Sequence, residues 1–197
     1  MEQRKGFTLV ELAIVLVIIG LILGAIVKGQ SLVRNAKYKK LVNDLRGLTA
    51  AYYTYYDRYR SVPGDDPKAK DRWNSIYNQI ESGDGNGLIE DSNANGVNEE
   101  EQAWRHLRAA AIIPGDPNED PVIHPATPYG GVYDFTKYDF KLGSSNATFN
   151  CIKINGLPSD IAQRLDEDLD DGIYNRGDIQ TDKDYKTTAT IDVYYKI

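Results

Sequence analysis

Residues 7–27 read FTLVELAIVLVIIGLILGAIV, and this stretch decides the architecture of the chain. Its 21 residues include a single charged side chain, Glu11. As an α-helix the stretch would rise about 1.5 Å per residue and span roughly 30 Å, the thickness of the hydrocarbon core of a membrane. We therefore predict a transmembrane helix over residues 7–27.

The residues on either side of this stretch indicate its orientation and its fate. Arg4 and Lys5 precede it, and basic residues at this place keep the N-terminus on the cytoplasmic side. An ordinary secretory signal has a shorter apolar region, which a cleavage site of small residues follows. Here Gly29 leads into a charged stretch with a helical pattern instead. We therefore expect the apolar helix to stay in the mature protein.

Glu11 is the most informative residue of the stretch. A carboxylate inside a membrane helix costs roughly 2.5 to 3.5 kcal/mol on insertion scales, so it indicates a function. The alternative is a carboxylate close enough to the helix end to reach the lipid headgroups.

The string KGFTLVE at residues 5–11 resembles the prepilin peptidase recognition site of type IV pilins and of the pseudopilins of type II secretion. The common pattern is a short basic leader, a glycine, a phenylalanine, and a glutamate as the fifth residue after the glycine. The resemblance implies that residues 1–6 are a leader, that the chain is cleaved between Gly6 and Phe7, and that Phe7 is N-methylated. It also implies that Glu11 pairs with the free amino terminus of a neighbouring subunit.

The same resemblance implies partners and a location. The partners are the prepilin peptidase, other pilin or pseudopilin subunits, and the bacterial inner membrane, which the chain crosses once before assembly. The assembled filament is periplasmic or extracellular. A formal net charge of −6 argues against nucleic acid as a partner, and a single cysteine excludes an intrachain disulfide.

Beyond residue 27 the pattern becomes amphipathic. We predict one long helix over residues 7–60, with residues 28–60 packed on a globular domain of residues 61–197. One helical face, an arc of about 100°, carries this stripe: Leu41, Leu45, Leu48, Tyr52, Tyr55, Tyr56 and Tyr59. The tyrosines are interpreted as packing residues, and an aromatic path for electrons along a filament is the alternative.

The remaining chain predicts an α+β domain with an antiparallel sheet packed on the long helix, a pilin-like arrangement. The expected elements are helices over 67–80, 98–111 and 159–169, a loop over 112–130, and strands over 131–142, 149–154 and 187–197. Apolar alternation in the first strand changes phase at Thr136 and Lys137, which predicts a turn or bulge there.

Residues 82–99 are dense in oxygen donors and glycines, which favours calcium. The string DSNANG at residues 91–96 matches the first half of an EF-hand loop, but Gln102 occupies the position of its bidentate glutamate. Some pilin-like proteins stabilise a loop with calcium where others use a disulfide. We predict a structural Ca²⁺ ion, and a solvated turn is the alternative. The predicted ligands are Asp84, Asn86, Asp91, Asn93, Asn95 and Glu99.

A second acidic run, DEDLDDG, covers residues 166–172 at the end of a predicted helix. Negative charge is unfavourable at a helix C-terminus, and a bound cation would offset it. A solvated or turn-capping set of side chains is the alternative, and the run resembles an Asp-Asp-Gly turn of some pilin-like proteins.

Catalysis has no support in the sequence, because the two histidines lack a recognisable partner constellation and no phosphate-binding loop is present. We therefore predict a structural subunit, not an enzyme. Three classes remain: a major or minor pilin, a pseudopilin of type II secretion, and a membrane-anchored binding protein that does not polymerise. The peptidase motif and Glu11 disfavour the third class. The segment after the long helix, residues 61–66, does not reproduce the loop typical of major pseudopilins, which favours a pilus.

Overall fold

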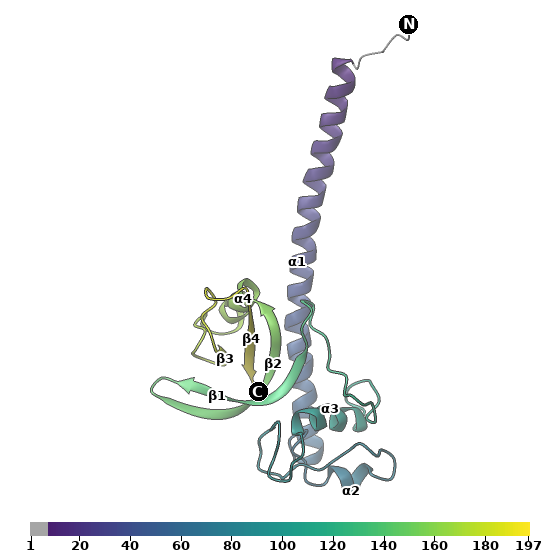
Figure 1. Cartoon of the computed structure of the whole chain (residues 1–197), viewed down its shortest axis with the longest axis vertical. Helices are drawn as coiled ribbons and strands as arrows, with labels where there is room; N and C mark the ends of the chain where they lie inside the picture. Colours follow the sequence, from purple (N-terminus) through teal and green to yellow (C-terminus); the bar gives the residue numbers. More distant parts are fainter. Residues whose placement is uncertain (1–7) are drawn as a thin grey trace. The chain divides into compact units, whose positions relative to one another are not determined.

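The computed structural model describes residues 8–197 (Figure 1). The leader, with Gly6 and the predicted cleavage site before Phe7, lies outside the described residues. The structure divides into two compact units at Lys40, so the unit of Leu41–Ile197 contains the last part of the long helix together with the globular residues.

The long helix is present as α1, Leu9–Tyr59, which confirms the prediction of one continuous helix. The helix is followed by Arg60, which has a left-handed backbone with a φ of 55°, and then by the Pro63-Gly64 turn. A residue in this conformation is a common helix terminator.

Within Leu41–Ile197, the predicted stripe is the face of α1 that packs into the domain. Five of its side chains are buried, Tyr59 is half-buried and Tyr56 is exposed. The Tyr52 ring stacks on Phe135 of the sheet with 6.2 Å between ring centroids. The buried residues of the stripe are Leu41, Leu45, Leu48, Tyr52 and Tyr55.

The sheet is antiparallel and four-stranded. Its strands are β1 (Tyr133–Leu142), β2 (Ser145–Pro158), β3 (Ile179–Thr181) and β4 (Thr190–Lys196), in the order β1-β2-β4-β3. Helix α4, Ser159–Leu169, has the predicted bounds and contacts β2, β3 and β4 (Figure 1). The α+β prediction, with an antiparallel sheet on the long helix, is confirmed.

The turn or bulge predicted at Thr136 and Lys137 is wrong. The register of β1 on β2 runs unbroken from Tyr133 to Leu142. The phase changes because the buried face of the strand changes. Phe135 packs against Trp104, whereas Phe140 on the opposite face packs near Phe149. The irregularity of this sheet lies instead in β2, between Ile154 and Leu157.

The helix predicted over residues 67–80 is also too long. Helix α2 covers only Ala69–Trp73, and Ile76, which lies within the predicted range, is 66% exposed. The amide of Asn78 instead donates to the side-chain oxygen of Asn118, 2.9 Å away. A distant loop therefore provides the hydrogen bond that a longer helix would have made.

Helix α3, Glu99–Ala109, lies within the predicted range 98–111, and Asn98 is its cap. The Asn98 side chain accepts from the Glu101 amide at 3.1 Å. The sequence reading missed the two-residue turn between β1 and β2, in which Gly143 has a φ of 70°, and the short strand β3.

His106 of α3 connects two loops from inside the domain. It is fully buried; its Nδ1 accepts from the Gly64 amide at 2.9 Å, and its Nε2 lies 2.8 Å from the Glu81 carbonyl. Both contacts are satisfied by a neutral ring that carries its proton on Nε2. Burial lowers the pKa of His106 from 6.5 to about 4. The neutral ring therefore joins the end of α1 to the loop before residue 82.

Protonation of His106 should destabilise the fold. Because its pKa is lower in the folded chain, its contribution is complete above pH 6.5 and is lost as the pH falls toward 4, by about 3 kcal/mol. We expect His106→Gln to be less stable at pH 7.5 but to lack this loss. Denaturant unfolding of both full-length chains in detergent, followed by tryptophan fluorescence with a chelator present, measures the difference. Parallel pH profiles would contradict the assignment.

Candidate functional site

The first turn of α1 is a capping box made by Thr8 and Glu11. Glu11 Oε2 accepts from the Thr8 amide at 2.8 Å and from the Thr8 hydroxyl at 2.9 Å, and the Glu11 amide donates to that hydroxyl at 3.2 Å. Among residues 8–197, nothing donates a hydrogen bond to the other oxygen, Oε1. Glu11 therefore has a local structural role and one carboxylate oxygen left for a further partner.

The apolar part of α1 is uncovered in the single chain. Its large side chains from Leu9 to Val33 are exposed, and the helix includes a window long and apolar enough to cross a membrane, none of which is buried. Water is an unfavourable environment for so much apolar surface, so this segment needs lipid or other protein around it.

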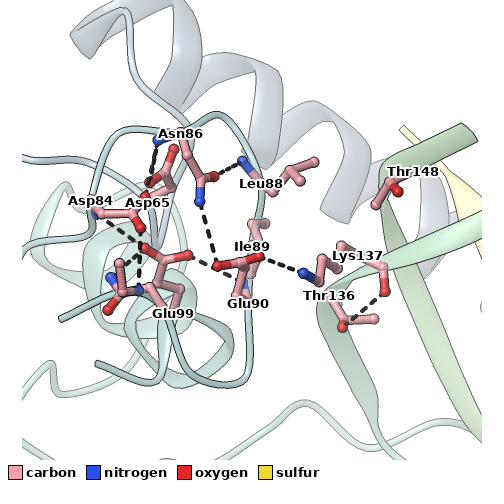
Figure 2. Close-up of polar contacts among 12 residues, drawn as sticks. Asp65, Asp84, Asn86, Leu88, Ile89, Glu90, Glu99, Thr136, Lys137 and Thr148 are labelled. Carbon is pink, nitrogen blue, oxygen red and sulfur yellow. Dashed lines mark hydrogen bonds and ion pairs between the residues drawn. The ribbon is translucent and has the colours of Figure 1, made fainter. Parts of the chain in front are cut away.

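Three carboxylates from separate parts of the sequence meet in the globular unit, and we call them the Asp65 cluster. Asp65 follows α1, Asp84 lies in the glycine-rich loop, and Glu99 begins α3 (Figure 2). One carboxylate oxygen from each lies within 4.8 Å of the others. Asp65 and Glu99 are buried, and Asp84 is half-buried. Three short segments of the chain therefore build the site.

Asp65 organises the glycine-rich loop. Its Oδ1 accepts from the Gly85 amide at 2.6 Å and the Asn86 amide at 3.2 Å, and its Oδ2 accepts from the Gly87 amide at 2.6 Å. The loop therefore folds around this carboxylate with three consecutive amides directed at it.

Glu99 holds the other side of the same loop. Its Oε1 accepts from the Asp84 amide at 3.2 Å and from the Asn93 side-chain amide at 2.7 Å, and its Oε2 accepts from the Glu90 amide at 3.1 Å (Figure 2). Glu90 in turn pairs with Lys137 of β1, which links the loop to the sheet.

The cluster carries negative charge that no basic side chain among residues 8–197 neutralises by an ion pair. Burial raises the pKa of Asp65, and the charge of Asp84 adds to this, while the amides of Gly87 and Gly85 oppose it. Burial likewise raises the pKa of Glu99, opposed by the hydrogen bond from Asn93. The charged cluster therefore favours a nearby cation.

Two glycines permit the close approach of these segments. A Cβ on Gly83 would lie 2.6 Å from the Asp65 carbonyl carbon and 2.7 Å from the Gly64 oxygen. Gly64 has a φ of 93°, and a Cβ there would collide with the Glu99 carbonyl oxygen and approach the Ala103 Cβ at 3.2 Å. The backbone of the site is therefore assembled only with glycine at these two positions.

The structure brings only part of the predicted ligand set together. Asp84 and Glu99 lie in the cluster, and Asn93 reaches it through its donating amide. The oxygen of Asn93 accepts from the amides of Asn95 and Val97, at 2.9 and 3.0 Å, as in a local turn. The Asn86 oxygen accepts from the Leu88 amide at 2.8 Å, and Asp91 is not a member of the cluster.

Asp65 is the residue that the sequence reading missed. Its only sequence signal was its place in the turn after the long helix, next to Pro63-Gly64. The donor set as observed suits a hard cation, because it consists of carboxylate oxygens. Calcium–oxygen distances of about 2.3 to 2.6 Å place two ligands of one ion up to about 5 Å apart. The spacing of the three carboxylates agrees with this limit.

Comparison with known proteins identifies the N-terminal segment. Residues 1–27 match the model of the prokaryotic N-terminal methylation motif. No curated protein and no solved structure matches the chain significantly.

Proposed function

Because the chain carries the prepilin-type signal of type IV pilins and pseudopilins, we propose that it is the precursor of a structural subunit of a type IV pilus-type filament. The match over residues 1–27 is the observation that carries the proposal. In this proposal, prepilin peptidase cleaves between Gly6 and Phe7 and Phe7 is methylated. The subunit is held in the bacterial inner membrane by the apolar part of α1 before it joins other subunits.

The uncovered apolar segment supports polymerisation through α1. The same surface that lipid covers before assembly is covered by the α1 helices of other subunits afterwards. Packing of helices in place of lipid removes no net apolar surface from water, so a specific polar contact is needed to select one register. Glu11 supplies a charge in this otherwise apolar segment.

The partner of Glu11 is the amino group that cleavage creates at Phe7 of a neighbouring subunit. Two charges in a low-dielectric filament interior are tolerated when they are paired. The capping box leaves Glu11 Oε1 available for this contact while Thr8 holds Oε2. In this proposal, the charge of Glu11 acts between subunits, and its capping hydrogen bonds act within one subunit.

The two roles of Glu11 can be separated with matched variants. Glu11→Gln keeps an oxygen that can cap the helix and removes the charge, whereas Thr8→Val removes the hydroxyl and keeps the charge. Expressed in a host with the filament machinery, Glu11→Gln should reduce sheared filaments at least about tenfold, corresponding to a lost charge pair of about 1.4 kcal/mol or more. Thr8→Val should assemble to near the wild-type level.

Removal of the leader is measured in both variants by mass spectrometry, so that an uncleaved chain is not scored as an assembly defect. Normal filaments from Glu11→Gln together with poor assembly of cleaved Thr8→Val would show that Glu11 acts only as a cap, and would contradict the register role.

The alternative function is that of a pseudopilin in the periplasmic filament of type II secretion, because pilins and pseudopilins share the N-terminal signal. The segment 61–66 supports the pilus, since it lacks the loop typical of major pseudopilins. Filaments on the cell surface support a pilus, and loss of protein secretion on deletion of the gene supports a pseudopilin.

We further propose that the Asp65 cluster binds a structural Ca²⁺ ion that stabilises the loop of residues 82–99. The uncompensated charge of three carboxylates supports this, as does their spacing. Asp65, Asp84 and Glu99 would hold the ion, and bound calcium would supply the positive charge that the buried cluster lacks. Backbone carbonyls and water would complete the six to eight ligands that calcium takes.

If the Asp65 cluster binds calcium, the rise in melting temperature with calcium should depend on Asp84 and not on Asp91. In thermal melts of the full-length chain in detergent, calcium in place of a chelator should raise the midpoint by about 5 to 10 °C. Asp84→Asn should lose the greater part of this rise. Asp91→Asn removes the same charge from a predicted ligand outside the cluster and should keep it. Equal wild-type midpoints, or loss of the rise in Asp91→Asn alone, would contradict the proposal.

A further inference from the structure

The loop that follows α4 gathers a second set of carboxylates, which we call the Asp166 cluster. It consists of Asp166 in the last turn of α4 together with Asp170 and Asp171, which follow the helix. One carboxylate oxygen from each lies within 4.8 Å of the others. None of these residues belongs to the Asp65 cluster.

Asp166 has an unpartnered oxygen inside the protein. The residue is fully buried, and its Oδ2 accepts from the Tyr185 hydroxyl at 2.7 Å. Its Oδ1 is shielded from water and has no hydrogen-bond partner among residues 8–197. The Gly172 amide favours the charged form of this carboxylate, but no hydrogen bond from it reaches Oδ1. A buried carboxylate oxygen without a partner costs free energy of folding. A bound group that contacts this oxygen would remove that cost.

The charges around Asp166 increase this cost. Asp170 and Asp171 are both acidic, and the negative end of the α4 dipole lies at the same place. Among the described residues, Arg176 pairs with the cluster: its Nε lies 3.2 Å from Asp171 Oδ2, and its side chain is 71% exposed. An ion pair of this exposure contributes little, so most of the negative charge stays uncompensated.

The two other aspartates are held in place by backbone amides. Asp170 Oδ2 accepts from the amides of Asp178 and Ile179, at 2.5 and 2.8 Å, and Asp171 Oδ1 accepts from the Ile173 amide at 2.9 Å. These contacts fix the positions of the carboxylates that face Asp166, and they tie the loop to the start of β3.

We propose that the Asp166 cluster is a second binding site for a divalent cation, and that the cation is calcium. Carboxylate oxygens are the hard ligands that calcium takes, and two of them bound to one calcium ion lie at most about 5 Å apart. The carboxylate oxygens of this cluster lie within 4.8 Å of one another, which satisfies that limit. The ion contacts the unpartnered oxygen of Asp166 and offsets the charge at the end of α4. Its structural effect is to fasten the loop of residues 170–178 between α4 and the edge strand β3.

The test uses hydrogen exchange of the full-length chain in detergent, measured by mass spectrometry with calcium chloride or with a chelator. Calcium should slow exchange at least about threefold in peptides that cover residues 170–179. Asp171→Asn should abolish this protection, because it removes one charge while its side-chain oxygen can still accept from Ile173. Asp160→Asn, an exposed acidic residue in the first turn of the same helix, should keep the protection.

The peptide resolution separates this site from the Asp65 cluster. Protection limited to residues 82–99 would overturn the second site and leave the first intact, and protection limited to 170–179 would do the reverse. Asp171→Asn with wild-type protection would also overturn the proposal. Asp166→Asn is a second variant that keeps an acceptor for Tyr185; if it folds but still gains full protection from calcium, the buried oxygen is not a ligand.

Discussion

The packing of one face of α1 into the globular unit is the interaction on which the rest of the structure depends. The buried stripe from Leu41 to Tyr55 contacts the sheet and lies beside α3 in the core, and each fully buried large apolar side chain contributes about 1.5 to 3 kcal/mol. This packing ends α1 at the turn before Asp65. The turn then delivers Asp65 to the glycine-rich loop and the Gly64 amide to His106.

The two ends of α1 differ in what covers their apolar side chains. Its stripe is covered by the chain's own domain, whereas the side chains from Leu9 to Val33 have no cover within the single chain. In the proposed function, this division lets the apolar part of α1 exchange lipid for other subunits while the globular unit keeps its fold. Glu11 is the exception in the apolar segment, and within the single chain its carboxylate is held by the capping box with Thr8.

Local patterns predicted the elements whose structure is set locally. The long helix, helix α3 and the bounds of α4 follow from apolar periodicity, and all three are present. The features that the sequence did not predict depend on contacts between residues that are distant in the chain. Asn118 replaces the expected end of α2, and a change of buried face in β1 resembles a bulge when it is read from the sequence alone. Asp65 lies 19 residues before Asp84, and only the fold brings their carboxylates together.

The proposed function depends on two events: cleavage of the chain before Phe7 and polymerisation through α1. The most direct measurement is the intact mass of the protein in filaments sheared and sedimented from cells that express it with prepilin peptidase and the assembly machinery. We expect a chain that begins at N-methylated Phe7 in the sedimented filaments, and an uncleaved chain confined to the membrane when the peptidase is absent. Filaments built from the chain with residues 1–6 still attached, or a cleaved chain that stays monomeric in the membrane, would contradict it.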